Sequence, residues 1–231
     1  MSISFSIEQL CCANARRDET FEKYRFGARL PQFVEHFRAH KINPSKPTII
    51  SIKELRRCMS TDKLSYILPH QIVQLFSSVG DYAIASVECA CFTKNVSFSD
   101  YNPFSYAQLY DYSKVEKIDS HCFRLYDTFG ESGKAMMGYT ILCVLYAFRD
   151  ENGVPDMNKL LMVESYHFPL QEKAKMDIAK YLAESFPALR HEYFGNYEDK
   201  YGSLPTVRVG DFNLFKDDPS FSEIYDILTI N

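Results

Sequence analysis

The sequence predicts one α/β domain of three layers, in which N-terminal helices and a later helix flank a mixed central sheet. Two observations carry this prediction: apolar residues recur at helical spacing over the first 80 residues, and the segments become strand-like from Tyr82 on. With 231 residues the chain is long for one domain and short for two, and no linker or repeat divides it. We therefore expect a single domain over residues 1–231, with a helical part over 1–80 and a sheet-centred part over 81–231.

The N-terminal helices are predicted from spacing and capping signals. Phe21 and Tyr24 fall on one helical face. Further along, Ser51 precedes Glu54 by three residues, which is the spacing of a capping box at the start of a helix. Another helix is predicted over residues 69–79, because that segment opens on a proline and ends before a glycine.

The sheet is predicted from short apolar and β-branched segments separated by turn residues. The main predicted strands cover residues 82–92, 121–129, 135–148 and 159–168, with weaker strands at 206–209 and 224–230. Residues 95–112 are aromatic and polar, and we expect an irregular loop there. A helix is expected over residues 170–185, because the apolar spacing changes from strand-like to helical after the last main strand. The inward face of this helix consists of Ala174, Ile178 and Leu182.

The composition excludes several classes of function. The net charge is −4 and the basic residues are scattered, so the chain offers no basic face for nucleic acid. Its longest apolar run, residues 141–148, is too short for a membrane span, which takes about 20 residues. The N-terminus lacks a signal-peptide pattern, and the seven cysteines follow neither a disulfide framework nor a zinc-site spacing. We expect a cytoplasmic protein with reduced thiols, no metal, no nucleic-acid partner and no membrane span.

Local catalytic motifs are scarce. The chain contains no G-x-G-x-x-G, P-loop, H-E-x-x-H or G-x-S-x-G pattern, which argues against the familiar ATP- and NAD-driven chemistries. His121 and Cys122 are adjacent, but neighbours in a strand point to opposite faces, so a catalytic Cys122 would need a base from elsewhere. One interpretation is therefore a Cys/His-dependent, hydrolase-like effector. Its candidate bases and orienting carboxylates are His167, His191, Asp127 and Asp211.

The block from His121 to Phe186 gives a second interpretation. Two predicted strands joined by a turn are followed by a third strand that runs into a helix, an order that resembles the central part of the GNAT acyltransferase superfamily. The segments that carry the resemblance are Lys134–Tyr139 and Leu160–Phe168. The resemblance implies a splayed third strand whose exposed backbone holds an acyl thioester. Pro169 replaces the family's glycine-containing loop and removes an N–H donor, which favours acyl carrier protein over coenzyme A as the thioester carrier.

Two short motifs are similar to those of the acyl-homoserine-lactone synthases, a GNAT-like branch. Arg17-x-x-x-Phe21 resembles their N-terminal Arg-x-x-x-Phe, and Glu164-x-x-His167 resembles their strand signature Glu-x-x-Arg. The resemblance implies autoinducer synthesis for quorum sensing, in which an acyl group passes from acyl carrier protein to S-adenosylmethionine. It implies these substrates and no tightly bound cofactor.

The resemblance also assigns roles to particular residues. Glu164 would be the catalytic base that takes a proton from the attacking amine, and the backbone N–H groups of Met162 and Val163 would hold the thioester oxyanion. His167 stands where the signature has arginine and counts as a substrate-binding residue. The residues expected to close over the second substrate are Arg17, Phe21 and Arg25. The expected acyl pocket consists of Phe123, Leu142, Val144, Tyr146 and Phe148.

A third interpretation is a non-enzymatic interaction protein of the phage- or pathogen-effector type. The aromatic content of 15% and the absence of local motifs suit it equally well. The exposure of Glu164 separates the alternatives, because an enzyme would bury this residue in a concave site and a binding module would leave it on a convex surface. A binding module would also show a flat aromatic patch drawn from Tyr101, Phe104, Tyr106, Tyr110 and Tyr112.

Overall fold

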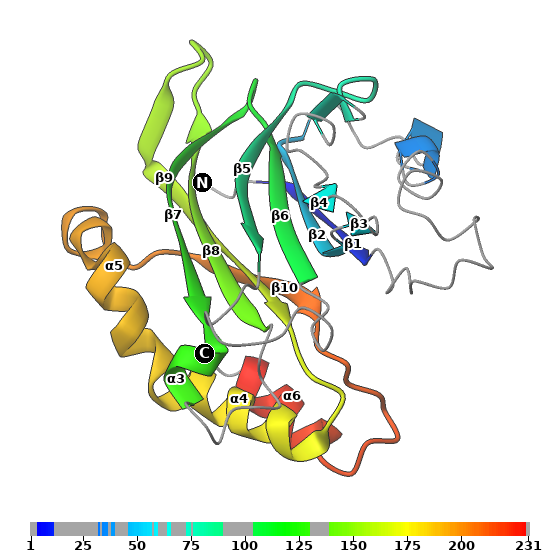
Figure 1. Ribbon diagram of the computed structural model, residues 1–231. Helices are drawn as coiled ribbons and strands as arrows, with labels where there is room; N and C mark the ends of the chain where they lie inside the picture. Colours follow the sequence, from blue (N-terminus) through cyan, green and yellow to red (C-terminus); the bar gives the residue numbers. More distant parts are fainter. Residues whose placement is uncertain are drawn as a thin grey trace.

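Two four-stranded β-sheets form the centre of the protein, and Figure 1 shows them as two layers with helices beside one of them. The structure is a computed structural model. It describes residues 4–11, 32, 34–36, 38–39, 46–56, 58–59, 64–65, 73–74, 76–89, 104–129 and 139–229.

The first sheet holds strands from the first half of the chain. Its strands, in order across the sheet, are β1 (Ser6–Cys11), β2 (Thr48–Arg56), β6 (Phe104–Asp111) and β5 (Tyr82–Cys89). β1 runs parallel to β2, whereas β6 is antiparallel to both of its neighbours. β2 forms because its first residues are rich in β-branched side chains, which favour the pleated, buried surface of a sheet. A separate two-stranded ladder joins β3 (Cys58–Met59) and β4 (Leu64–Ser65).

The second sheet holds the later strands. Its strands, in order across the sheet, are β10 (Thr206–Asp211), β9 (Pro155–His167), β8 (Thr140–Arg149) and β7 (Val115–Arg124). β7, β8 and β9 are successive antiparallel strands, and β10 pairs parallel to β9. The turn between β8 and β9 contains Gly153 at φ +77°, a conformation that glycine adopts without steric strain.

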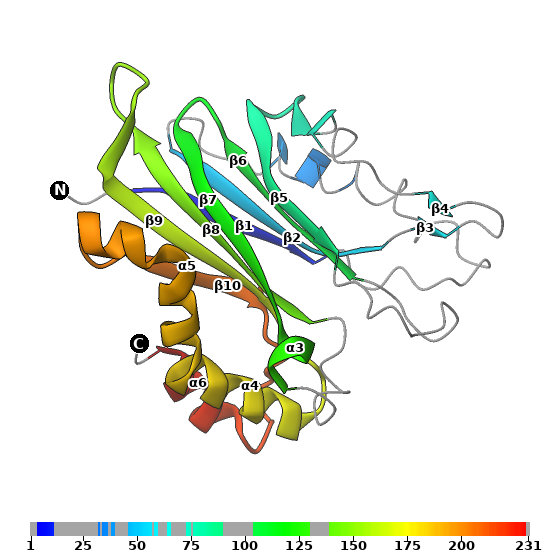
Figure 2. The same cartoon turned by 60° about the vertical axis from the view of Figure 1, so that its left-hand side comes forward.

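Helices cover the outer face of the second sheet (Figure 2). They are α3 (Leu125–Phe129), α4 (Glu172–Glu184), α5 (Phe186–Tyr201) and α6 (Phe221–Thr229). The buried face of α4 includes Ala174, Ile178 and Leu182, which share one core cluster with side chains of β8 and β9. No helix among the described residues is long and apolar enough to cross a membrane.

The strand β8 lies at the centre of the packing and serves two cores. Its alternate residues Ile141 and Cys143 pack toward the helices, whereas Leu142 and Val144 pack between the sheets against a cluster that includes Ile49 of β2. A strand with both faces covered has no polar face, which accounts for its continuous apolar sequence. The prediction that this segment is central and buried on both faces is confirmed.

The predicted fold class is wrong, since the protein has two packed sheets and not one central sheet between helical layers. The expected helical part over residues 1–80 contains β1 and β2, and its described helical residues lie only within 32–39 and 73–76. Ser51 and Glu54 lie in β2 and not at the start of a helix. The reason is that Ser51 is fully buried between two sheets, a tertiary environment that overrides a local capping signal.

Two further segments differ from the sequence prediction. β6 occupies part of the stretch 95–112 that we expected to be an irregular loop. The segment 224–230 was predicted as a strand, but α6 covers residues 224–229 and buries Ile224 in the core cluster that also contains residues of α4. In contrast, the predicted passage from a strand at 159–168 into a helix at 170–185 is confirmed by β9 and α4.

Candidate functional site

The carboxyl ends of four strands meet at one end of the two-sheet packing. β1 is parallel to β2, and β9 is parallel to β10. Ser51 of β2 reaches across to Ser165 of β9, with 2.8 Å between the two Oγ atoms. Figure 2 shows β1, β2 and β10 running toward the same end. The side chains at the carboxyl ends of β9 and β10 therefore lie at that end.

Three strand residues point between the sheets at this end. Val207 and Val209 of β10 pack between the sheets, and Asp211 follows at the same two-residue spacing. In β9 the same alternation carries His167 to this face, and the register pairs His167 directly with Asp211. Thr140 of β8 lies one residue beyond the paired Ile141 and Tyr166, and so stands opposite His167.

A tight turn after β10 adds Asn213 to this group. Its backbone N–H donates to Oδ1 of Asp211 at 3.0 Å, and its side-chain amide donates to the carbonyl oxygen of Phe168 at 2.6 Å. Asn213 has a φ of 48°, a left-handed conformation that asparagine tolerates better than most residues. We call Thr140, His167, Asp211 and Asn213 the carboxyl-end site.

The backbone of β9 approaches β10 closely beside this site. A Cβ atom added to Gly210 would lie 2.3 Å from the carbonyl oxygen of Tyr166, so only glycine fits there. The N–H of Phe168 donates to the carbonyl oxygen of Asp211 at 2.8 Å, which extends the ladder past the end of the strands. The pair His167 and Asp211 is therefore held in a fixed register.

A buried polar network lies between the two sheets next to the site and includes Ser165, two residues before His167. The side-chain amide of Gln108 donates to Ser165 Oγ at 2.8 Å, and the hydroxyl of Tyr146 donates to the Gln108 carbonyl at 2.8 Å. Burial raises the pKa of Tyr146 well above its usual value, so the hydroxyl stays neutral and remains a donor. Ser51 completes the network from the opposite sheet. Each of these groups has a partner, as buried polar groups require.

Thr140 departs from that rule. Its side chain is 1% exposed, and its Oγ1 atom has no hydrogen-bond partner among the residues that the structure describes. Next to it, the ring of Tyr139 lies edge-on to His167, with 5.2 Å between ring centroids. His167 itself is 4% exposed. Thr140 and His167 are thus buried, whereas Asp211 and Asn213 are partly buried, and electrostatic interactions among these side chains are stronger than in bulk water.

A metal site is not complete within the part of the chain that the structure describes. No three His, Cys, Asp or Glu side chains lie close enough together there to hold a metal ion. Asp211 contributes one carboxylate, the kind of ligand that Mg²⁺ and Ca²⁺ prefer. Asp211 is the one carboxylate among the four residues of the carboxyl-end site.

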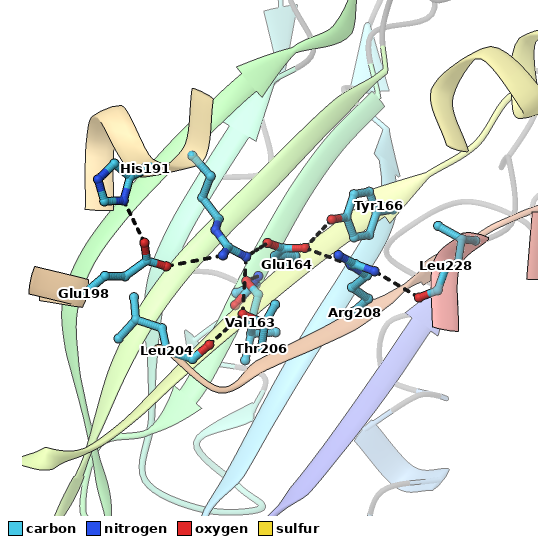
Figure 3. A network of polar contacts seen from close by, with 11 residues as sticks. Val163, Glu164, Tyr166, His191, Glu198, Leu204, Thr206, Arg208 and Leu228 are labelled. Carbon is cyan, nitrogen blue, oxygen red and sulfur yellow. Dashed lines mark hydrogen bonds and ion pairs between the residues drawn. The ribbon is translucent and has the colours of Figure 1, made fainter. Parts of the chain in front are cut away.

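Glu164, the base of the acyl-transfer interpretation, lies on the other face of β9, toward α5 (Figure 3). It is fully buried and accepts hydrogen bonds from Arg190 at 2.9 Å, from Arg208 at 3.3 Å and from the Tyr166 hydroxyl. Arg208 also donates to the carbonyl oxygen of Leu228 at 2.9 Å. Glu164 therefore ties β9 to β10, α5 and α6.

The same network reaches the surface through α5. Arg190 also contacts Glu198 at 3.3 Å. The carboxylate of Glu198 lies 2.8 Å from Nδ1 of His191, within hydrogen-bond distance. The hydrogen bond from Glu198 raises the pKa of His191. His191 is more than half exposed, so it is a surface residue and not part of the carboxyl-end site.

The structure separates the residues that the acyl-transfer interpretation grouped together. Met162 faces the helices and Val163 faces the other sheet. Phe123 likewise lies in the core beneath the helices, whereas the rest of the expected acyl pocket packs between the sheets. Those inter-sheet residues are Leu142, Val144, Tyr146 and Phe148. The expected substrate-closing residues Arg17, Phe21 and Arg25 lie outside the described residues.

The His–Cys pair is also separated, as the strand geometry predicts. Cys122 packs against the core between the sheets, and His121 stacks on Tyr193 of α5 with 3.7 Å between ring centroids. Asp127, a proposed orienting carboxylate, lies in α3.

Sequence reasoning named His167 and Asp211 together, as a candidate base and orienting carboxylate of the Cys/His-dependent interpretation, and it missed Thr140, Asn213 and the supporting Ser51 as site residues. One signal could have found Asn213. The run Gly210-Asp-Phe-Asn213 ends a valine-rich strand with a glycine, a carboxylate and an asparagine. Such residues tolerate the close approach and left-handed turn that polar sites at strand ends use.

Comparison with known proteins shows the fold. No protein-family model matches the chain, and no curated protein matches it. The solved mannosyl-6-phosphatase of Bacteroides thetaiotaomicron has a TM-score of 0.60 at 14% identity, and the match covers 98% of this chain and 70% of that one. An endonuclease/exonuclease/phosphatase from Bacteroides vulgatus has a TM-score of 0.53 at 17% identity, with 97% and 70% covered.

A third solved structure is ANGEL2, a 2′,3′-cyclic phosphatase in complex with adenosine-2′,3′-vanadate. Its TM-score is 0.60 at 17% identity, and the match covers 96% of this chain but 57% of that one. The chain thus spans somewhat more than half the length of this neighbour. At such identities the likeness shows the fold alone, which is that of endonuclease/exonuclease/phosphatase proteins.

These findings overturn the resemblance to GNAT acyltransferases. The strand–strand–helix block is present, but β9 is not splayed, because its residues Met162 to His167 all pair with β10. The N–H of Met162, the proposed oxyanion donor, donates to the carbonyl oxygen of Pro205 at 2.8 Å. Acyl transfer, autoinducer synthesis in quorum sensing, and acyl-thioester and S-adenosylmethionine substrates are therefore wrong predictions for this chain.

Proposed function

We propose that this protein hydrolyses phosphate esters at the carboxyl-end site. The observation that carries the proposal is the juxtaposition of Asp211 and His167, which are paired in register on two parallel strands; His167 is 4% exposed and Asp211 is partly buried. Two neighbours with this fold are a mannosyl-6-phosphatase and a 2′,3′-cyclic phosphatase, and a third is an endonuclease/exonuclease/phosphatase. Fold alone does not establish function, so the proposal depends on the side chains at the site.

The two side chains supply complementary chemistry for attack of water on phosphorus. Asp211 can accept a proton from the attacking water, and the hydrogen bond from the Asn213 N–H fixes the orientation of its carboxylate. As the water oxygen bonds to phosphorus, the bond from phosphorus to the ester oxygen breaks, and the departing alkoxide takes a proton from solvent. His167 can donate a hydrogen bond to a phosphoryl oxygen, whose negative charge increases in the transition state. The burial of His167 and the partial burial of Asp211 make both interactions stronger than they would be in water.

The charge of the chain favours a small substrate. A net charge of −4 with scattered basic residues offers no face for the repeated phosphates of a nucleic acid. A small phosphate ester presents only one phosphate to the site. We therefore expect a low-molecular-weight ester to be hydrolysed in preference to an oligonucleotide.

The test is phosphate release by the purified chain from p-nitrophenyl phosphate, bis(p-nitrophenyl) phosphate and a single-stranded oligonucleotide, with and without Mg²⁺. His167→Ala should lower release by about 10²-fold or more, the usual contribution of a positioned acid or base. His191→Ala is the matched control, because it removes an exposed histidine outside the site. Equal release by the wild type and His167→Ala would refute the assignment, and preferred cleavage of the oligonucleotide would refute the substrate class.

A second candidate function is phosphate binding without turnover. It is favoured by one observation: the buried Thr140 Oγ1 has no hydrogen-bond partner among the described residues, and such a hydroxyl can hold a phosphate oxygen without any chemical step. Titration calorimetry with inorganic phosphate separates the two candidates, because a binding protein would take up phosphate and release none from the esters.

A further inference from the structure

Two chain segments leave the carboxyl-end site side by side. One runs from Phe168 into α4 as far as Lys175, and the other runs from Asp211 to Asp218 before α6. His167 directly precedes the first segment and Asp211 begins the second, so the geometry of the segments determines how these two side chains meet.

The segments are joined at the end near the site. Asn213 donates to the Phe168 carbonyl oxygen at 2.6 Å, and the Phe168 N–H donates to the Asp211 carbonyl oxygen at 2.8 Å. The rings of Phe168 and Phe212 pack edge to face with 5.3 Å between centroids. These contacts fix the turn after β10. On the Asp211–Asp218 segment, however, they reach no further than Asn213.

A second junction lies at the far end. Nζ of Lys175 donates to Oδ2 of Asp218 at 2.7 Å, and the Lys175 side chain is only 2% exposed. The same carboxylate oxygen accepts from the N–H of Phe215 at 3.1 Å, so the ion pair also closes the turn of the second segment. Ser220 adds a longer contact to Glu172 at 3.4 Å.

The buried ammonium group needs an explanation that packing does not give. Removing a lysine charge from water carries a large desolvation penalty, and an apolar residue of similar volume would fill the same space. What an apolar residue would not supply is a directed contact to one point on the neighbouring segment. The geometry therefore favours the interpretation that the ion pair fixes the position of the neighbouring segment and does not only add stability.

We propose that Lys175 and Asp218 are positioning residues, whose ion pair holds the far end of the Asp211–Asp218 segment and thereby keeps Asp211 beside His167. The effect on catalysis rests on the proposed phosphoesterase function. The effect on the segment itself does not, and it can be measured without any substrate.

The test compares Lys175→Met, which keeps the volume and removes the charge, with Ile178→Val as a matched control. Ile178 is fully buried on the same helix but makes no contact in this polar junction. Hydrogen exchange of the Asn213 amide, measured relative to amides of β8, reports the site end of the segment. We expect exchange to accelerate by about tenfold or more in Lys175→Met and to stay within about twofold of wild type in Ile178→Val.

Turnover supplies the second measurement. With p-nitrophenyl phosphate, Lys175→Met should lower kcat by about tenfold with little change in KM, since a small displacement of a reacting group lowers the rate more than binding. Asp218→Glu keeps the charge and should restore most of the rate that Asp218→Asn loses. If Lys175→Met does not fold, the exchange and turnover measurements are made on Asp218→Asn and Asp218→Glu instead.

The outcomes are distinguishable. If only Phe215 exchanges faster and Asn213 does not, the ion pair is a local brace and the positioning proposal is wrong. The proposal also fails if Ile178→Val accelerates Asn213 as much as Lys175→Met does. If the wild type hydrolyses no phosphate ester, the proposed function fails. The exchange measurements still decide whether the ion pair between Lys175 and Asp218 fixes the position of the Asp211–Asp218 segment.

Discussion

Replacing Glu164 by glutamine should destabilise the fold strongly, because this carboxylate is fully buried between two guanidinium groups. Arg190 and Arg208 contact its two oxygens at 2.9 and 3.3 Å, and their side chains are 18% and 17% exposed. Glutamine keeps the volume and part of the hydrogen bonding but removes the charge that both arginines face. Two mostly buried cations would then share no counter-charge in β9.

The magnitude follows from this geometry. Breaking a buried ion pair by removing one partner usually lowers the free energy of unfolding by about 3–5 kcal/mol. Arg190 keeps Glu198 at 3.3 Å and both arginines retain some contact with solvent, so we expect the lower end, about 3 kcal/mol. For a chain of this length that corresponds to a fall in Tm of about 6–12 °C.

Urea denaturation followed by circular dichroism measures the effect. The control is Asp177→Asn, which removes a surface pair with Lys173, a residue that is 92% exposed, and should change stability by less than about 0.5 kcal/mol. A Glu164→Gln protein within about 1 kcal/mol of wild type would refute the conclusion that this network holds α5 and β10 to β9.

Two further predictions concern the backbone of β10 and the surface end of the network. Gly210→Ala should lower the free energy of unfolding by about 3 kcal/mol in the urea denaturation assay, because the added Cβ would lie 2.3 Å from the Tyr166 carbonyl oxygen. Gly153→Ala should lower it by only about 1 kcal/mol, because the space around Gly153 is open and the cost comes from its φ of +77° alone. The bond to Glu198 raises the folded-state pKa of His191, so its stabilisation is full below the unfolded pKa of about 6.5 and is lost as pH rises through the higher folded pKa. The Tm difference between wild type and His191→Gln should therefore shrink from pH 5 to pH 9, and a difference that grows over this range would contradict the assignment.

Local signals were sufficient for the segment that leads to the site. The change of periodicity near residue 169 predicted the passage from β9 to α4, and the inward residues Ala174 and Ile178 are buried as expected. Here the sequence pattern and the tertiary environment agree, so neighbouring residues alone determine the structure.

Non-local pairing explains where the prediction failed. Whether strands form one sheet or two depends on which distant strands pair, and a periodicity of two residues is the same in both cases. The spacing of Ser51 and Glu54 suits a helix start, but the buried pairing of β2 with β1 and β6 overrides it. For α6, apolar residues at 224–230 fit either a buried strand or a buried helix face, and packing on α4 decides.

The sequence predicted the site only in part, for the same reason. His167 and Asp211 are 44 positions apart in the chain and meet because the parallel register of β9 and β10 pairs them. Thr140 joins them only through the antiparallel register of β8. Residue types at strand ends can suggest such a site, but the register that brings them together is a property of the folded sheet.

The most direct test of the central conclusion is phosphate release by Asp211→Asn. Asparagine keeps an oxygen that can accept the Asn213 N–H, so the turn should remain intact, but it cannot take a proton from water. Asp217→Asn, an exposed residue of the same loop, is the control. We predict that Asp211→Asn loses about 10²–10⁴-fold of the hydrolysis rate on p-nitrophenyl phosphate while Asp217→Asn keeps the wild-type rate. Hydrolysis by Asp211→Asn at the wild-type rate would contradict the assignment of the carboxyl-end site.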